Sequence, residues 1–121
     1  MSPAFAQLCA DLAGIEAARL ADEQDLAGLL LAAASAAGLT PATGPVVRVG
    51  PEGVGAVLLC HGGHVLLHGV PDTGCCFVDV AGLKGAPLQR GFDVVLRRLG
   101  AHPARRASRS DPREAAATEG E

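Results

Sequence analysis

Aromatic side chains are nearly missing from this chain of 121 residues, which contains no Trp and no Tyr. Its only aromatic residues are Phe5, Phe77 and Phe92. A site that stacks on the flat ring of a ligand needs such side chains, so the sequence argues against ring stacking. The hydrophobic content of 49% comes from small aliphatic residues instead, and a chain of this length can bury one core without disulfides or metals.

Basic charge is also scarce. Ten basic residues, of which only Lys84 is a lysine, stand against 13 acidic ones, for a net charge of -3. Because no basic stripe alternates with aromatic residues, we expect no nucleic-acid binding. No apolar run reaches the roughly 18 residues of a membrane-spanning helix, and no basic segment precedes an apolar stretch at the N-terminus, so we expect a cytoplasmic protein without membrane association.

A secretory context is missing as well, which bears on the four cysteines, Cys9, Cys60, Cys75 and Cys76. A disulfide framework needs such a context. We therefore expect reduced thiols.

Two segments have the features of helices. Acidic residues open the segment 22–38, its leucines share one face, and Gly38 ends it. Segment 88–99 is amphipathic and ends at Gly100. The spacing in segment 4–12 does not decide between a helix and a strand.

Short apolar segments separated by Gly and Pro turns predict an antiparallel meander, with strands at 46–49, 54–60, 64–70 and 75–80. A weak edge strand is predicted at 101–106. The fold class expected is α+β, a two-layer sandwich in which two helices cover one face of an antiparallel sheet. The domain spans 1–106, and the Pro-, Arg-, Ser- and Ala-rich segment 107–121 is expected to be a disordered tail. The uncovered face of such a sheet meets water or a partner.

Chemically active side chains crowd into one segment, HGGHVLLHGVPDTGCCFVDV at 61–80. On a strand, His64 and His68 lie on one face but too far apart to bind one ion, and Cys75 and Cys76 face opposite sides. No zinc-binding spacing is present, so no metal site is predicted. A nucleophilic Cys76 beside His68 is a second hypothesis, although buried cysteines more often behave as small apolar groups.

The order of residues in this region resembles the prokaryotic pyruvoyl-dependent S-adenosylmethionine decarboxylase family. The family pattern runs G-V-S-G, a strand, E-S-H, three residues, H-T-W-P-E and a strand ending V-D-x-F-T-C-G. The match is ungapped and aligns with Gly53, Val54, His64, His68, Pro71, Val78 and Asp79. The resemblance extends over about residues 4–106 and implies the same fold, with helices before and after the motif.

The resemblance implies a self-made cofactor that this chain lacks the residue to make. In the family, the serine of E-S-H attacks the preceding carbonyl, and cleavage of the chain leaves a pyruvoyl group that acts as the electron sink in decarboxylation. The equivalent position here is Gly63, and the preceding glutamate is Gly62. Since glycine has no hydroxyl, no pyruvoyl group is expected.

Other positions of the family's site have changed in the same direction. The processing serine of G-V-S-G is Gly55, the proton-donating cysteine is Leu83, and the two aromatic residues that enclose adenine are Val49 and Val70. The resemblance implies that His68, a proton donor in processing, is a retained catalytic position whose partner residues, the serines and the cysteine, are missing. It also leaves Asp72 in place of the ribose-binding glutamate.

These substitutions predict a non-self-processing pseudoenzyme or regulatory paralogue related to polyamine (spermidine) biosynthesis. Because family members pair across sheet faces, we expect a homodimer, or a heterodimer with a catalytic paralogue, through the exposed sheet face. One alternative is an active decarboxylase, acting on S-adenosylmethionine or a basic amino acid by an unconventional route. Another is a small-ligand or metal-binding module built on His61, His64, His68 and the nearby cysteines.

Overall fold

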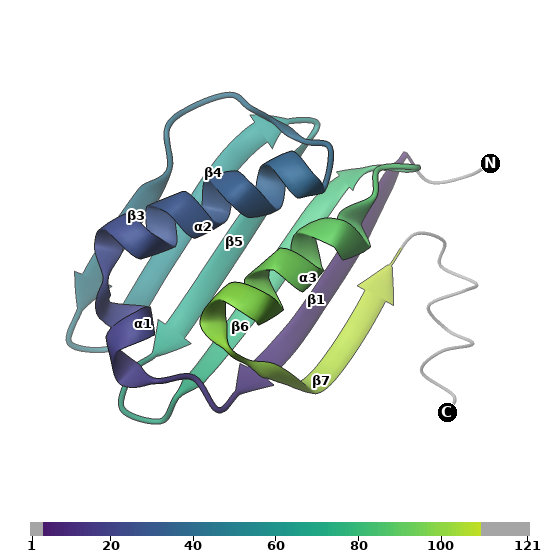
Figure 1. Ribbon diagram of the computed structural model, residues 1–121. Helices are drawn as coiled ribbons and strands as arrows, with labels where there is room; N and C mark the ends of the chain where they lie inside the picture. The colour runs from purple at the N-terminus through teal and green to yellow at the C-terminus, as the bar shows by residue number, and fades with distance from the viewer. Residues whose placement is uncertain (1–3, 110–121) are drawn as a thin grey trace.

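The structure is a computed structural model that describes residues 4–109, and the side chains of residues 4–103. Within these residues, one seven-stranded antiparallel sheet carries helices on a single face (Figure 1). The elements in chain order are β1 (Phe5–Ala13), α1 (Ala17–Ala21), α2 (Glu23–Ala36), β2 (Thr40–Pro41), β3 (Val46–Gly50), β4 (Gly53–His61), β5 (Gly63–Val70), β6 (Cys75–Leu83), α3 (Leu88–Leu99) and β7 (His102–Arg109).

The strand order is β2-β4-β5-β6-β1-β7, with β3 also pairing with β4. Strands β4, β5 and β6 follow one another as the predicted meander. β1 returns from the start of the chain to lie between β6 and β7, antiparallel to both. One side of the sheet is therefore formed by β1 and β7, which come from the two ends of the described chain.

The core lies between the sheet and the helices. Helix α2 begins where the Asp22 carboxylate accepts a hydrogen bond from the backbone N–H of Asp25 at 3.0 Å, and α3 ends at Gly100 in a left-handed conformation with φ 62°. Both helices direct leucines and small residues toward every second side chain of β4, β5 and β6. The fully buried set includes Leu26, Leu30, Leu58, Leu67, Val65, Val78, Val80, Phe92 and Val95.

The predicted α+β sandwich and its main elements are confirmed, with differences at the ends of the sheet. Segment 4–12, which the sequence left open, forms β1 because the edges of β6 and β7 both pair with it. Two short elements were not predicted: α1, a five-residue helix that buries only Leu20, and the two-residue β2. Such short elements carry too few residues to establish a period.

The predicted edge strand at 101–106 exists, but it runs from His102 to Arg109. Three residues assigned to the disordered tail 107–121 therefore belong to β7, because pairing with β1 continues as far as Gln7. Residues 110–121 lie outside the described part of the chain.

None of the helices within residues 4–109 is both long enough and apolar enough to cross a lipid bilayer.

Candidate functional site

The histidines of β5 lie on the sheet face that the helices leave uncovered, which we call the open face. Side chains alternate along β5 as predicted: Val65 and Leu67 are buried under the helices, whereas His64, Leu66 and His68 are on the open face and at least partly accessible. His64 and His68 thus belong to one surface, although they are spread along it.

Gly63 begins β5 directly after the tight turn at His61 and Gly62, where Gly62 has a φ of 75°. The backbone of β6 crowds this position. A Cβ built on Gly63 would overlap the carbonyl oxygen of Ala81 and lie 2.9 Å from the Cα of Gly82. The glycine is therefore required by the close approach of two strands, in addition to being the position aligned with the family's serine.

The counterparts of three family site residues come together at this end of the sheet. A Cβ on Gly62 would lie 3.2 Å from Leu83 Cδ1, so Gly62, Gly63 and Leu83 are neighbours. Gly62 and Gly63 line a shallow groove of about 470 Å³ together with Phe5, Leu59 and His64, whereas Leu83 lies outside this lining. The lining is mostly apolar, and the aligned serine position contributes no hydroxyl to it.

His68 lies far from this groove. Gly63 and His68 are five residue steps apart on an extended strand, a distance of about 16 Å along β5. Its neighbours across the sheet are Gly55 on β4 and Phe77 on β6, and grooves of about 450 Å³ lie on either side of it. The structure therefore does not bring Gly63 and His68 into one catalytic cluster.

The hypothesis of a Cys76 nucleophile beside His68 is wrong. His68 pairs with Phe77, so Cys76 points to the opposite, helix-covered side and is buried. Burial raises the pKa of the Cys76 thiol to about 12, with a smaller opposing effect from the backbone of His68. A thiol with this pKa is almost entirely protonated near neutral pH and is a poor nucleophile.

Asp72 lies in the turn between β5 and β6 and is exposed. It is absent from the lining of both grooves beside His68. Val49 and Val70, aligned with the adenine-enclosing aromatics, are also not brought together: Val49 pairs with the buried Val54, whereas Val70 pairs with the exposed Cys75 on the open face. No single nucleoside pocket connects these positions within the described chain.

The best-organised polar group on the open face is a network that the sequence analysis missed. Asp79 on β6 is buried, and its two carboxylate oxygens accept hydrogen bonds from His64 Nε2 at 2.7 Å and Gln7 Nε2 at 2.6 Å. The strand alternation indicated the face of His64. No local pattern predicted the contact of Gln7 with Asp79, because the register of β1 against β6 depends on long-range pairing.

A carboxylate only accepts hydrogen bonds, so the contact with Asp79 makes Nε2 of His64 the donor and leaves Nδ1 as the acceptor of the neutral ring. This fixes the ring beside the groove at Gly63. Among the described residues, no group of three or more His, Cys, Asp or Glu side chains is arranged to hold a metal ion. The network is thus a hydrogen-bonded polar cluster within a mostly apolar surface.

Comparisons with known proteins agree with the fold and the motif order. The family model described as S-adenosylmethionine decarboxylase matches residues 6–110. The crystal structure of the adenosylmethionine decarboxylase from Aquifex aeolicus VF5 is similar to this structure with a TM-score of 0.75 at 23% sequence identity, over 90% of this chain and 89% of that chain. No curated protein sequence matches the chain. The match of the family model over most of the chain places this protein in the S-adenosylmethionine decarboxylase family.

Proposed function

We propose that this chain is a non-self-processing member of its family, related to polyamine biosynthesis, that acts as a regulatory or structural partner and not as a decarboxylase. The observation that carries the proposal is Gly63. It stands where the family has its pyruvoyl-forming serine, and the backbone of Ala81 occupies the space that a side chain would need.

The residues at this position do not fit a pyruvoyl group. Formation of that group begins with a hydroxyl oxygen on the residue at 63, and glycine supplies none. The turn before Gly63 is also a two-strand hairpin in which Cys60 pairs directly with Gly63. Glycine at this point leaves no side-chain group that could start the cleavage.

The remaining site residues support the same conclusion. His68 has Gly55 and Phe77 as its cross-strand neighbours, so the position of the second processing serine contributes no hydroxyl. Leu83 offers no proton at the position of the family's cysteine. Decarboxylation of an amino acid requires an electron sink, and an isolated imidazole does not provide one.

We propose that the open face binds a second chain of the same fold, in a homodimer or in a heterodimer with a catalytic relative. Apolar side chains protrude from this face: Phe5 is 58% exposed, Leu59 55% and Leu83 54%. Further exposed members are Val46, Val70 and Phe77. Face-to-face packing of two sheets would remove these side chains from water.

The intact mass of the denatured, purified chain tests the central claim. We expect one uncleaved species that carries all residues on both sides of Gly63. Two fragments that separate between Gly62 and Gly63, with a blocked end on the second, would overturn the proposal. Release of CO₂ from S-adenosylmethionine, arginine or ornithine by the purified chain would overturn it as well.

A further inference from the structure

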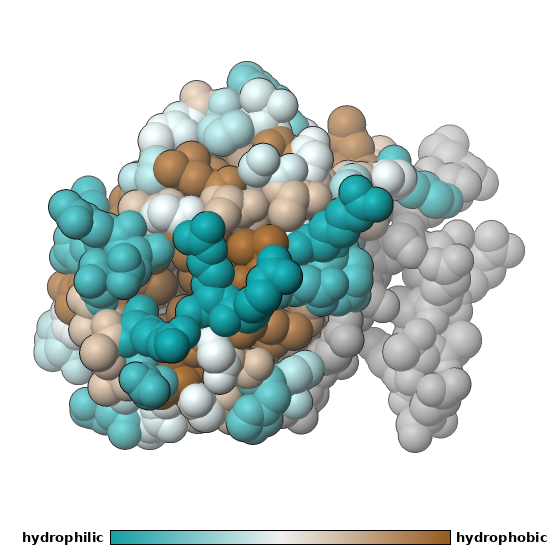
Figure 2. Space-filling model, viewed as in Figure 1, coloured by the Kyte–Doolittle hydropathy of each residue, from teal (hydrophilic) through white to brown (hydrophobic). Residues whose placement is uncertain are grey.

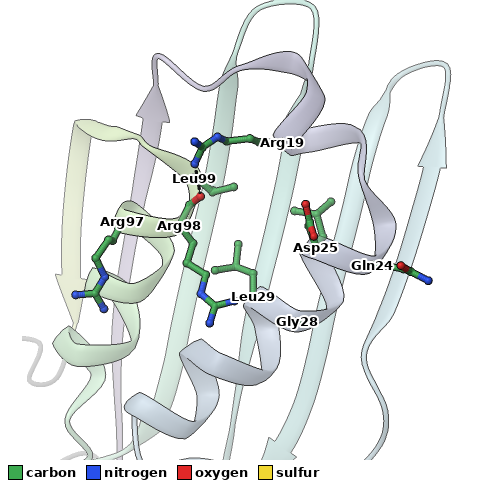
Figure 3. Close-up of a pocket in the computed structure, with 9 residues that line it drawn as sticks. Arg19, Gln24, Asp25, Gly28, Leu29, Arg97, Arg98 and Leu99 are labelled. Carbon is green, nitrogen blue, oxygen red and sulfur yellow. Dashed lines mark hydrogen bonds between the residues drawn. The ribbon is translucent and has the colours of Figure 1, made fainter.

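A groove of about 590 Å³ lies on the opposite side of the molecule from the open face, where α1, α2 and the end of α3 meet (Figure 3). Its walls carry Arg19 from α1, Asp25 and Gly28 from α2, and Arg97 and Arg98 from α3. Leucines of α2 and α3 that are almost completely buried close its floor. The groove is therefore a surface site that does not open into the core.

The lining of this groove is positively charged. Three arginines and one aspartate give it a formal charge of +2, in a protein whose formal net charge is -3. Within the part of the chain whose side chains are described, none of the three guanidinium groups forms an ion pair. Figure 2 shows strongly hydrophilic side chains gathered over α3, with apolar surface beside them. In Figure 3 the guanidinium of Arg97 is directed away from the groove, so Arg19 and Arg98 are the cationic groups that a ligand in it would meet.

One of these guanidinium groups is held in place by the backbone. Arg19 Nη1 donates a hydrogen bond of 2.7 Å to the carbonyl oxygen of Arg98, in the last turn of α3, and Figure 3 shows this contact at the edge of the groove. The contact uses one of the five N–H groups of Arg19. The others remain available to a ligand from a guanidinium whose position is already fixed, which lowers the entropy lost on binding.

The mouth of the groove is kept open by Gly28. A Cβ at this position would have no heavy atom within 4 Å, so the glycine is not needed for packing between α2 and its neighbours. Arg98 reaches over the same region from α3, beside Leu29 (Figure 3). The open space at Gly28 and the positive charge of Arg98 therefore lie in the same part of the groove.

We infer that this groove binds a small polyanion that carries phosphate groups. Planar guanidinium groups donate paired hydrogen bonds to phosphate oxygens, and Arg19 and Arg98 present such groups from two different helices. The lack of any aromatic side chain in the lining gives no platform for a base, so the phosphate portion is the recognised part. This site is separate from the open face and does not depend on the proposed loss of self-processing.

Calorimetric titration of the full chain with inorganic pyrophosphate tests the inference, at an ionic strength kept constant with sodium chloride. We expect saturable binding. Arg98→Gln should weaken it about tenfold, the loss that follows removal of one charge-assisted hydrogen bond. Gly28→Leu should weaken it by filling the mouth without removing charge. Arg90→Gln, two turns earlier on α3 and outside the lining, is the matched control and should bind as the unmodified chain does.

Citrate, tested in parallel, separates recognition of phosphate from recognition of carboxylate, and we expect it to bind more weakly than pyrophosphate. Binding that is equal in Arg98→Gln, Gly28→Leu and the unmodified chain would overturn the inference. Equal weakening by Arg90→Gln and Arg98→Gln would also overturn it, because it would indicate diffuse attraction to α3. So would the absence of saturable pyrophosphate binding.

Discussion

His64 Nε2 lies 2.7 Å from Asp79 Oδ2, across neighbouring strands and on a sheet face that is otherwise largely apolar. The two residues are not directly opposite: Leu66 pairs with Asp79, so the imidazole reaches the carboxylate diagonally. Asp79 is only 5% exposed although no helix covers it, and Gln7 satisfies its other oxygen. This relationship joins β1, β5 and β6 through side chains.

Replacement of Asp79 by alanine should therefore destabilise the fold. The change removes the acceptor of two hydrogen bonds and leaves the Gln7 amide without a partner. We expect a loss of about 2 kcal/mol in the free energy of unfolding, the order expected for removal of hydrogen bonds to a charged acceptor. Urea denaturation followed by circular dichroism measures it. The exposed Asp72→Ala is the control, with an expected change within about 0.5 kcal/mol, and an equal loss in both variants would contradict the role of the network.

Restoring a serine at position 63 should not restore processing. Gly63→Ser supplies the hydroxyl, but its Cβ would overlap the carbonyl oxygen of Ala81, so β5 and β6 would have to separate. We expect an uncleaved chain whose free energy of unfolding is lower by about 1–3 kcal/mol, as for other overpacked sites. Intact mass and urea denaturation provide the two measurements.

Gly55→Ser is the matched control for that variant. A Cβ at Gly55 would lie 3.5 Å from His68 Nδ1, an ordinary contact on the open face. We expect its stability to stay close to that of the unmodified chain. Cleavage of Gly63→Ser would show that the missing hydroxyl alone prevents processing, and full stability of that variant would contradict the packing argument.

Pairing through the open face predicts that a charge placed there weakens association. Leu59→Lys introduces an ammonium group at a position that is 55% exposed in the single chain and would be buried against a second sheet. Sedimentation velocity should show dimers of the unmodified chain and monomers of the variant at the same concentration. Leu31→Lys, at a 42% exposed position on α2, is the control and should leave dimers intact. Monomers of the unmodified chain, or dissociation by both variants, would exclude this mode of self-association.

The reactivity of the thiols should depend on their burial. Cys75 is exposed and should react with iodoacetamide in the native chain at pH 8, whereas Cys60 and Cys76 are buried and burial raises the pKa of both. Mass spectrometry of peptides locates the label. Rapid native labelling of Cys76 would contradict its placement under the helices.

The same thiol predicts a pH dependence of stability. Unfolded Cys76 loses its proton near its ordinary pKa of 9.0, whereas the folded thiol keeps it up to a pKa of about 12. Its contribution is therefore complete below pH 9 and declines as pH rises from 9 toward 12. Between pH 9 and 12, the free energy of unfolding should fall less steeply with pH in Cys76→Ala than in the unmodified chain. Identical slopes would contradict the raised pKa of the Cys76 thiol.

The sequence was sufficient for the layers but not for the site. Alternation in 64–70 placed His64 and His68 on one face, and the glycines of HGG predicted the hairpin, because both depend on local chemistry. The register of β1 against β6 depends on pairing between segments about 70 residues apart. For this reason the Gln7–Asp79 contact did not follow from spacing. The face of Cys76 relative to His68 depends instead on the register of β5 against β6, in which His68 pairs with Phe77.

The groove between α1, α2 and α3 escaped prediction for a related reason. Arg97 and Arg98 are the basic residues expected at the end of a helix, where they favour the helix dipole. Their concentration with Arg19 arises only when α3 packs beside α1 and α2. Local patterns explain each of these arginines separately, and the groove that they line exists only in the tertiary structure.

Two helical glycines, Gly28 on α2 and Gly91 on α3, should respond in opposite directions to the same substitution. Gly28 has no heavy atom within 4 Å of a built Cβ, so Gly28→Ala brings only the higher helix propensity of alanine. We expect the free energy of unfolding to rise by about 1 kcal/mol.

Gly91 lies where α3 packs directly on α2. A Cβ there would lie 2.6 Å from the carbonyl oxygen of Ala33 and 2.8 Å from the Cβ of Ala37. Since the obstacle is backbone and a short side chain, the two helices would have to move apart, and we expect Gly91→Ala to lower the free energy of unfolding by about 1–3 kcal/mol despite the gain in propensity. Urea denaturation of the pair separates helix propensity from helix packing. Stabilisation by both substitutions would mean that α2 and α3 are not in close contact at Gly91, and destabilisation by both would mean that Gly28 is enclosed and its groove is not open.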